Sequence, residues 1–261
     1  MNYSLSIIIP TYKPGVYLFE CLDSVCYQMN SHIIYEILIV LNGPLEPYYE
    51  ALSNEFLSRY SEFNIRLLYC SFKGVSNARN LGINEAKGKY LFFLDDDDVL
   101  SNDYFNQMLR KIEAYDEKTI VVSNVYSFYR STNEKNNDYL TFTRESKNII
   151  ENRKYLSNSC CKLIPKEIIG ERRFNVHFTN GEDALFMFSI SDRISNIVIS
   201  SSSIYFRRLR ENSASRKKVG IFERINRIIK QQIEYTIIYF RNPFKYNFIL
   251  YLTRLLAVFK Q

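Results

Sequence analysis

The chain has 261 residues, of which 46% are hydrophobic and 24% are charged. This composition supplies enough apolar side chains for one large or two small domains and excludes a disordered chain. The five cysteines form no Cys-x-x-Cys pair and are odd in number. That pattern disfavours both a disulfide framework and a zinc site, and it fits a reducing cytoplasm.

The first residues run directly into an apolar strand pattern, without the basic segment or cleavage site of a secretion signal. Strand patterns then alternate with helical patterns through the first half of the chain. The predicted strands are Leu5–Ile9, Glu36–Val40, Arg66–Cys70, Tyr90–Leu94 and Thr119–Tyr126, and the predicted helices are Val16–Gln28, Leu45–Tyr60, Val75–Ala86 and Asn102–Ala114. This alternation predicts an α/β fold whose mostly parallel sheet lies between layers of helices.

The second half of the chain begins after a polar stretch, Ser131–Asp138, which has the composition of a surface loop. The segments expected beyond it are Tyr139–Phe142, Cys160–Ile164, a helix from Asp183 to about Asp192 and a strand through Ile197–Arg207.

Four consecutive carboxylates, Asp95 to Asp98, directly follow the apolar strand Tyr90–Leu94. Clustered like charges are costly unless a cation neutralises them, so the cluster favours a divalent-metal site. A solvated turn before the next helix is the alternative, because acidic residues also favour helix N-termini. Pro10-Thr11-Tyr12 and Leu41–Pro44 also follow strands, and ligands of such sheets collect at the strand ends, so we expect these segments to share one edge.

Four segments occur in a characteristic order, namely Ser6–Tyr12, Gly74–Ile83, Ala86–Asp98 and Gly181-Glu182-Asp183. This order resembles that of the family 2 glycosyltransferases of GT-A fold, and the resemblance runs from about Ser4 to Ser215. It implies a GT-A domain over residues 1–215, with a nucleotide-binding half over 1–100 and an acceptor-binding half over 101–215. Residues 216–261 would form a separate tail.

The resemblance also assigns roles to the acidic residues. Asp95-x-Asp97 would be the Asp-x-Asp motif, in which Asp95 faces the ribose of the donor and Asp96 lies beside it in the donor site. Asp97 would ligate Mn²⁺ or Mg²⁺, and both ions prefer hard carboxylate and phosphate oxygens. Asp183 would be the general base of an inverting enzyme and Glu182 an acceptor contact, although a Glu-Asp pair can also simply begin a helix.

Further donor-site residues follow from the same resemblance. Pro10 and Thr11 would line the nucleoside pocket, with Tyr12 offering a flat face to the base. Arg79 would lie near the nucleotide or pyrophosphate, and an ion pair with the Asp cluster is compatible with that position.

Two positions depart from the family pattern. Asn42 stands where family members commonly have an acidic pair that reads uracil, and its amide offers both a donor and an acceptor to a base. Arg210 stands where the family often has a metal-binding His. Because a guanidinium cannot ligate a cation, Arg210 is expected to pair directly with the pyrophosphate.

The net charge of +6 resides in the tail, where ten Lys and Arg from Arg216 onward accompany Glu223 and Glu234. Isoleucines recur at helical spacing from Ile221 to Ile237, Asn242-Pro243 interrupts the pattern, and Tyr246–Phe259 continues it. No apolar run reaches the ~18 residues of a spanning helix, so the tail is expected to lie in an anionic membrane interface. Packing on the domain and a dimer interface remain alternatives, and the regular apolar spacing disfavours a nucleic-acid partner.

The sequence thus predicts a metal-dependent, inverting glycosyltransferase. It would move a sugar from a nucleotide-sugar, expected to be a UDP-sugar, to a saccharide or lipid-linked saccharide in bacterial surface polysaccharide assembly. Its expected location is the inner, cytoplasmic face of the cell membrane. A sugar nucleotidyltransferase is the alternative enzyme, although only Pro14-Gly15 stands where a glycine-rich phosphate loop would be, and a non-catalytic scaffold is the alternative outside catalysis.

Overall fold

The computed structural model describes residues 4–28, 33–210 and 220–260. In these residues, nine strands form one sheet in the order β3-β2-β1-β4-β8-β6-β9-β5, and β7 pairs with β6 outside this path. The strands are β1 (Leu5–Thr11), β2 (Tyr35–Asn42), β3 (Ile65–Cys70), β4 (Tyr90–Phe93), β5 (Val99–Leu100), β6 (Thr119–Phe128), β7 (Asn136–Asn137), β8 (Lys162–Pro165) and β9 (Asn196–Arg208).

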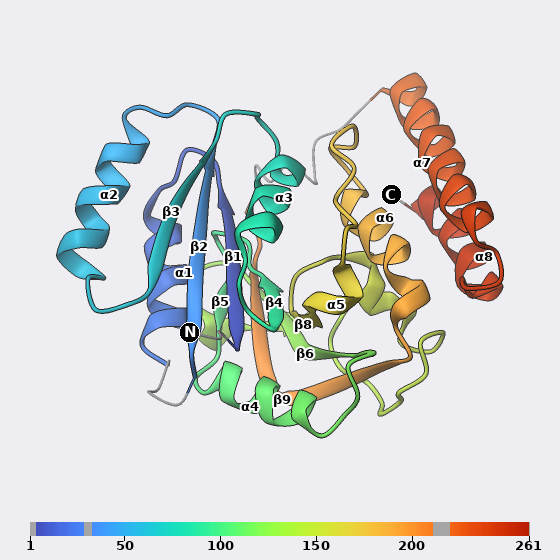
Figure 1. Cartoon of the computed structure of the whole chain (residues 1–261), viewed down its shortest axis with the longest axis horizontal. Coiled ribbons are helices and arrows are strands. Elements are labelled where there is room, and N and C mark those ends of the chain that lie inside the picture. The colour runs from blue at the N-terminus through green and yellow to red at the C-terminus, as the bar shows by residue number, and fades with distance from the viewer. Residues whose placement is uncertain (1–3, 29–32, 211–219, 261) are drawn as a thin grey trace.

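Helices flank this sheet (Figure 1). They are α1 (Val16–Cys26), α2 (Tyr48–Arg59), α3 (Val75–Glu85), α4 (Tyr104–Glu113), α5 (Lys166–Ile169), α6 (Glu182–Ser189), α7 (Ile221–Arg241) and α8 (Phe248–Ala257). Short 3-10 turns lie at Thr132–Glu134, Arg153–Ser157, Ser191–Arg193 and Val258–Lys260. The predicted α/β class is therefore confirmed, with the predicted first-half elements at nearly the predicted bounds.

The longer strand pairs are parallel, as predicted. β1 pairs in parallel with β2 and β4, β2 with β3, and β6 with β9. β1 and β4 are wholly buried, as expected for strands covered by helices on both faces. The antiparallel pairs are short and involve β5, β7 and β8.

The structure differs from the sequence prediction at two places, after β6 and at the start of α2. Part of the predicted surface loop Ser131–Asp138 forms a 3-10 turn and the short strand β7, which pairs with Tyr126 and Ser127. The helix expected at Leu45 begins only at Tyr48, because a residue that precedes a proline, here Glu46 before Pro47, is disfavoured in the helical backbone conformation.

The helices α7 and α8 lie at the edge of the molecule far from α2 (Figure 1) and pack on α6. The ring of Phe188 on α6 contacts Tyr235 edge-on at 5.3 Å and stacks with Tyr246 at 5.4 Å. Gln231 of α7 donates a hydrogen bond of 2.7 Å to the carbonyl oxygen of Asn180, just before α6. One face of the helical pair is thus part of the protein core.

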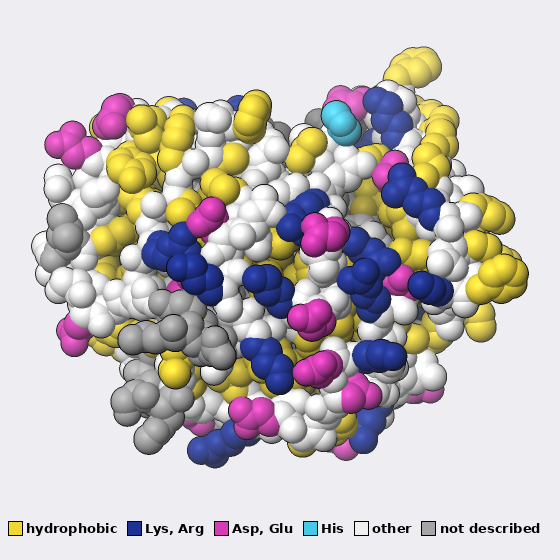
Figure 2. Space-filling view, in the orientation of Figure 1, with side chains coloured by type: hydrophobic (Ala, Val, Ile, Leu, Met, Phe, Trp, Pro, Cys, Tyr) yellow, Lys and Arg dark blue, Asp and Glu magenta, His cyan; other side chains and the backbone are white. Residues whose placement is uncertain are grey.

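The opposite face of α7 and α8 carries the isoleucine pattern predicted from the sequence. Its exposed side chains are Ile221, Phe222, Ile225, Ile229, Ile233, Ile237, Phe240, Phe244, Phe248, Ile249, Leu252, Leu256 and Phe259. We call this set the outward face, and Figure 2 shows its hydrophobic side chains along that edge of the molecule. No helix among the described residues is long and apolar enough to cross a membrane.

One predicted lipid-facing cation has a different position. Arg254 is buried and donates a hydrogen bond to the carbonyl oxygen of Arg153, so it joins α8 to the domain. The basic residues Arg216, Lys217 and Lys218, also expected to meet the membrane, lie outside the described residues.

Candidate active site

The ends of β1, β2 and β4 meet at one edge of the sheet, as the sequence predicted. The hydroxyl of Thr11, the last residue of β1, donates a hydrogen bond of 2.6 Å to Asp96 Oδ2. The Asn42 amide, at the end of β2, donates to the Thr11 carbonyl oxygen at 2.8 Å. Burial raises the pKa of Asp96, whereas the Thr11 hydrogen bond lowers it in part.

Arg79, on α3, lies at the centre of the candidate site and is 3% exposed. Its Nη1 is 2.8 Å from Asp183 Oδ1, and its Nη2 is 2.9 Å from Asp95 Oδ1. Glu182 Oε1 lies 3.9 Å from Nη1. One guanidinium therefore joins the Asp-x-Asp segment to the candidate base, which is 104 positions away from Arg79 in the sequence.

The surroundings of Arg79 keep its side chain charged and fixed. Burial alone would lower the pKa of Arg79, but Asp183 and Asp95 outweigh it and raise the pKa above its usual value. The guanidinium carbon lies 5.4 Å from the centre of the Phe174 ring, and Phe174 stacks on Phe186 at 3.9 Å. A planar guanidinium that lies against an aromatic ring is suited to orient two carboxylates at once.

Asp183 and Glu182 form the first turn of α6. Asp183 Oδ1 accepts hydrogen bonds from Arg79 and from the Ser159 hydroxyl, both at 2.8 Å, and Oδ2 has no partner among the described residues. Burial, and then the neighbouring charge of Asp183, raise the pKa of Glu182 to about 7. Its Oε2 is buried without a hydrogen-bond partner in the described part of the chain. Asp183 is thus held by two hydrogen bonds and keeps one oxygen available, whereas Glu182 is held mainly by burial.

Asp97 and Asp98 differ in their contacts. Asp97 Oδ2 forms an ion pair of 2.6 Å with Arg210 Nε. Asp98 is buried and accepts hydrogen bonds from the Tyr205 hydroxyl at 2.6 Å and from the Arg208 backbone N–H at 2.8 Å. Asp98 therefore attaches the acidic segment to β9, whereas Asp97 stays at the site.

The acidic segment fits a divalent cation that takes its other ligands from a donor. Burial and the charge of Asp95 raise the pKa of Asp97 to about 6, although Arg210 lowers it, so an added cation would stabilise the charged form. The Asp95 side chain is 44% exposed, and Asp97 Oδ1 has no hydrogen-bond partner among the described residues. No group of three or more His, Cys, Asp or Glu in the described ranges could hold a metal ion by itself. Phosphates and water would therefore have to complete the coordination shell.

Tyr12 follows Thr11 and is 42% exposed, as a residue offering its ring to a base should be. The ammonium groups of Lys13 and Lys73 lie 5.6 Å and 5.2 Å from its ring centre. Gly43 has a φ of 103°, and a Cβ at that position would overlap the Tyr12 ring. The glycine thus permits the position of Tyr12.

Two residues expected in the donor site are buried in the structure. Asn42 donates to the Thr11 carbonyl oxygen and accepts from the Gly74 N–H at 3.2 Å, so its amide links two loops at this edge. Pro10 is buried within β1, so it supports the edge from below.

Sequence reasoning missed several residues that hold the site. Ser159 and Phe174 lie in irregular segments without a motif, and their contacts with Asp183 and Arg79 exist only in the folded chain. Arg208 donates to the Asp97 carbonyl oxygen at 2.8 Å and pairs with Glu20. Its signal in the sequence was only its proximity to Arg210.

A model described as Glycosyl transferase family 2 matches residues 6–193 of the chain. Glycosyltransferase GlyA of Streptococcus pneumoniae is 29% identical over 227 residues, which are 81% of this chain and 31% of GlyA. Minor teichoic acid biosynthesis protein GgaB of Bacillus subtilis is 30% identical over 218 residues, which are 82% of this chain and 24% of GgaB. The chain therefore spans less than a third of either relative.

Among solved structures, residues 1–349 of S. aureus TarS in complex with UDP-GlcNAc superpose with a TM-score of 0.72 at 16% identity. The match covers 90% of this chain and 66% of that one. It shows that the mixed α/β architecture is the GT-A fold. Together with the match over residues 6–193, these similarities show that the chain belongs to glycosyl transferase family 2.

Proposed function

We propose that the chain is an inverting glycosyltransferase that moves a sugar from a nucleotide-sugar to a saccharide hydroxyl. The observation that carries the proposal is the position of Arg79, whose two terminal nitrogens hold Asp183 and Asp95 at 2.8 Å and 2.9 Å. A proton acceptor for the incoming hydroxyl and a carboxylate of the donor motif are thereby fixed relative to each other. Such fixed geometry is what a displacement at the anomeric carbon requires.

Asp183 accepts the proton of the acceptor hydroxyl at Oδ2, because Oδ1 is already bound by Arg79 and Ser159. The activated oxygen then attacks the anomeric carbon from the face opposite the nucleotide, so an α-linked donor gives a β-linked product. Glu182, whose pKa is raised to about 7, contacts another acceptor hydroxyl. The ring of Tyr12 supports the base of the donor.

Asp97, with Asp95, would hold Mn²⁺ or Mg²⁺. When bound, the ion supplies charge neutralisation for the departing nucleoside diphosphate. Arg210, which pairs with Asp97, would then turn toward the diphosphate and add a second positive charge.

The substrate classes rest on similarity to relatives. The solved TarS structure contains UDP-GlcNAc, which supports a UDP-sugar donor. GgaB is named for minor teichoic acid biosynthesis, which supports an acceptor in cell-surface polysaccharide assembly.

The outward face of α7 and α8 supports attachment to an anionic membrane surface. Phe222 is 91% exposed, and basic residues such as Arg227 and Lys230 lie along the same helix. Apolar side chains next to cations are suited to the interface of an anionic bilayer. A lipid-linked saccharide at that surface would be within reach of the enzyme.

The test is release of nucleoside diphosphate from a panel of nucleotide-sugars with Mn²⁺ and saccharide acceptors. We expect turnover by the wild type and a loss of about 10²–10⁴ in rate for Asp183→Asn, with donor affinity retained. Asp103→Asn is the matched control, since Asp103 is exposed and its φ of 59° suits Asn equally well. Equal turnover by the Asp183→Asn variant would reassign the base. Release of pyrophosphate from sugar phosphate and nucleoside triphosphate would support a nucleotidyltransferase.

A further inference from the structure

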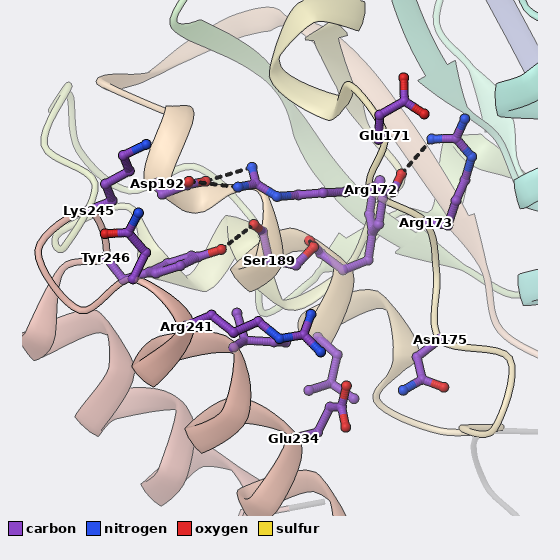
Figure 3. A pocket seen from close by; sticks show the side chains of 14 residues that line it. Glu171, Arg172, Arg173, Asn175, Ser189, Asp192, Glu234, Arg241, Lys245 and Tyr246 are labelled. Carbon is purple, nitrogen blue, oxygen red and sulfur yellow. Dashed lines mark hydrogen bonds and ion pairs between the residues drawn. The ribbon is translucent and has the colours of Figure 1, made fainter.

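A cavity of about 470 Å³ lies between the catalytic domain and the tail (Figure 3). One wall is formed by Arg172, Arg173 and Asn175, from the segment that joins α5 to α6. The other wall is formed by α7 and by the turn that follows it. The function proposed above does not involve this cavity.

The cations that line the cavity are not equally available. Arg172 is neutralised by Asp192 through two contacts of 2.7 Å. Arg173 donates to Asn84 and to backbone carbonyl oxygens. The side-chain nitrogens of Arg241 and Lys245, in contrast, form no hydrogen bond or ion pair with any described residue, and Figure 3 shows both side chains unlinked.

Unpaired acids also line the cavity. Glu234 and Glu171 have no ion pair among the described residues. Glu234 lies two helical turns before Arg241 on α7 and therefore on the same side of the helix. The negative charge of Glu234 would repel an anionic ligand. A neutral residue at this position should therefore increase the affinity for that ligand, the opposite of the effect expected from removing a cation.

Each of the free cations directly follows an exposed aromatic side chain. Phe244, directly before Lys245, is 99% exposed, and Phe240, directly before Arg241, is 65% exposed. In this segment, an apolar ring whose exposure to water is unfavourable is followed each time by a cationic residue. This arrangement matches the boundary of a bilayer, where phosphate groups lie directly above the acyl chains.

The cavity is joined to the candidate base by a single helix. α6 contributes Ser189 to the cavity and carries Asp183 in its first turn. Ser189 lies six positions after Asp183, which corresponds to about 9 Å of helix rise. A ligand anchored in the cavity would therefore hold its remaining part close to the site of transfer.

We propose that this cavity, through Arg241 and Lys245, binds the phosphate of a lipid-linked saccharide and so positions the acceptor. The inference rests on the proposed function, and it names the chemical class of the acceptor as a saccharide carried on a polyprenyl pyrophosphate. A pyrophosphate that joins a lipid to a saccharide carries more negative charge than the diester of a bulk phospholipid, as does the free polyprenyl phosphate monoester used as the probe below, so both gain more from two unpaired cations.

The experiment compares the double variant Arg241→Gln/Lys245→Gln with a double variant of equal charge, Arg227→Gln/Lys230→Gln. Both control residues lie on α7 and do not line the cavity. Flotation is measured with phosphatidylcholine vesicles that contain either polyprenyl phosphate or phosphatidylglycerol. We expect the cavity variant to lose about tenfold in affinity for the polyprenyl phosphate vesicles, and the control to lose about twofold. Glu234→Gln should bind these vesicles more tightly than the wild type.

Equal losses by the two double variants would overturn the proposal, because the effect would then be general surface charge. Equal wild-type affinity for both vesicle types would overturn the assignment of the acceptor. Release of nucleoside diphosphate by the wild type, measured with a soluble saccharide acceptor and without vesicles, tests the proposed function separately. If the wild type releases none from any nucleotide-sugar, the proposed function fails, whereas selective vesicle binding would still support the cavity as a phosphate site.

Discussion

Replacement of Arg79 by Met tests the arrangement of the candidate active site. The substitution keeps an unbranched side chain of similar length and removes the charge that Asp183, Asp95 and Glu182 share. Because Arg79 is 3% exposed, its loss leaves the largely buried carboxylates of Glu182 and Asp183 without their cation, whereas Asp95 remains partly in contact with water. Removal of one partner from a buried ion pair costs about 3–5 kcal/mol, which we expect as the loss in free energy of unfolding at pH 8.

The free energy of unfolding that Arg79→Met removes should be larger at high pH than at low pH. The pKa of Glu182 is already raised to about 7, although Arg79 lowers it, so the substitution raises it further. A folded-state pKa above the unfolded value means that stability is lost as pH rises through the interval between them. The variant should therefore lose less stability at pH 5, where Glu182 is protonated, than at pH 8.

The assay is urea denaturation of wild type and variant at both pH values. Arg59→Met is the matched control, because Arg59 pairs with Asp23 at 2.5 Å but is 41% exposed. Such a surface pair contributes less than about 1 kcal/mol. The reasoning would be refuted if Arg79→Met cost no more than Arg59→Met, or if its cost were the same at pH 5 and pH 8.

Four further substitutions test the remaining parts of the structure. Asp97→Ala should abolish the Mn²⁺-dependent part of nucleoside diphosphate binding in titration calorimetry, whereas equal wild-type affinity with Mn²⁺ and with chelator would leave Arg210 and Arg79 as the phosphate ligands. Glu182→Gln should increase the free energy of unfolding by up to about 3 kcal/mol at pH 8 and change it little at pH 5, since the folded-state pKa of about 7 lies above the unfolded one; a gain at pH 5 alone would contradict this sign. Ile233→Ser, on the outward face, should weaken flotation with anionic vesicles without lowering the melting temperature. Tyr235→Ala, on the inward face, should lower the melting temperature; the reverse pattern would contradict the assignment of the two faces.

The residues at this edge of the sheet could be predicted from the sequence, because each strand end is marked by a short local pattern. Strand ends at Thr11, Asn42 and Asp95 could be recognised from apolar runs followed by polar residues, and parallel pairing brings such ends together. The contact of Thr11 with Asp96 confirms this reasoning.

The support of the site could not be predicted from the same patterns. Arg79 could be expected near the Asp cluster, but its simultaneous bond to Asp183 depends on how α3 and α6 face each other. Ser159 and Phe174 carry no periodic or motif signal, because a hydroxyl or a ring can serve in many places. Asp98 resembled its neighbours in sequence, and only the position of Tyr205 on β9 separates its structural task from theirs.

The tail shows a limit of hydrophobic periodicity. The isoleucine stripe correctly predicted a helix, but the face that packs on the domain is the one with Gln231, Tyr235 and Tyr239. Aromatic rings and one amide that reaches a backbone carbonyl therefore form the intramolecular contact, and the more apolar stripe stays outside. Periodicity reveals that a helix has an apolar side, but it does not say what that side contacts.

The outward face also has a consequence for the behaviour of the chain in aqueous solution. Soluble monomers rarely expose contiguous apolar patches larger than a few hundred Å², and side chains such as Phe222, Phe244 and Leu256 are each more than two-thirds exposed. Water orders around such a surface, so the free energy of the isolated chain falls whenever two of these surfaces meet. The outward face therefore favours self-association of the chain in water, and a mild detergent that covers this face should disperse the protein without unfolding it.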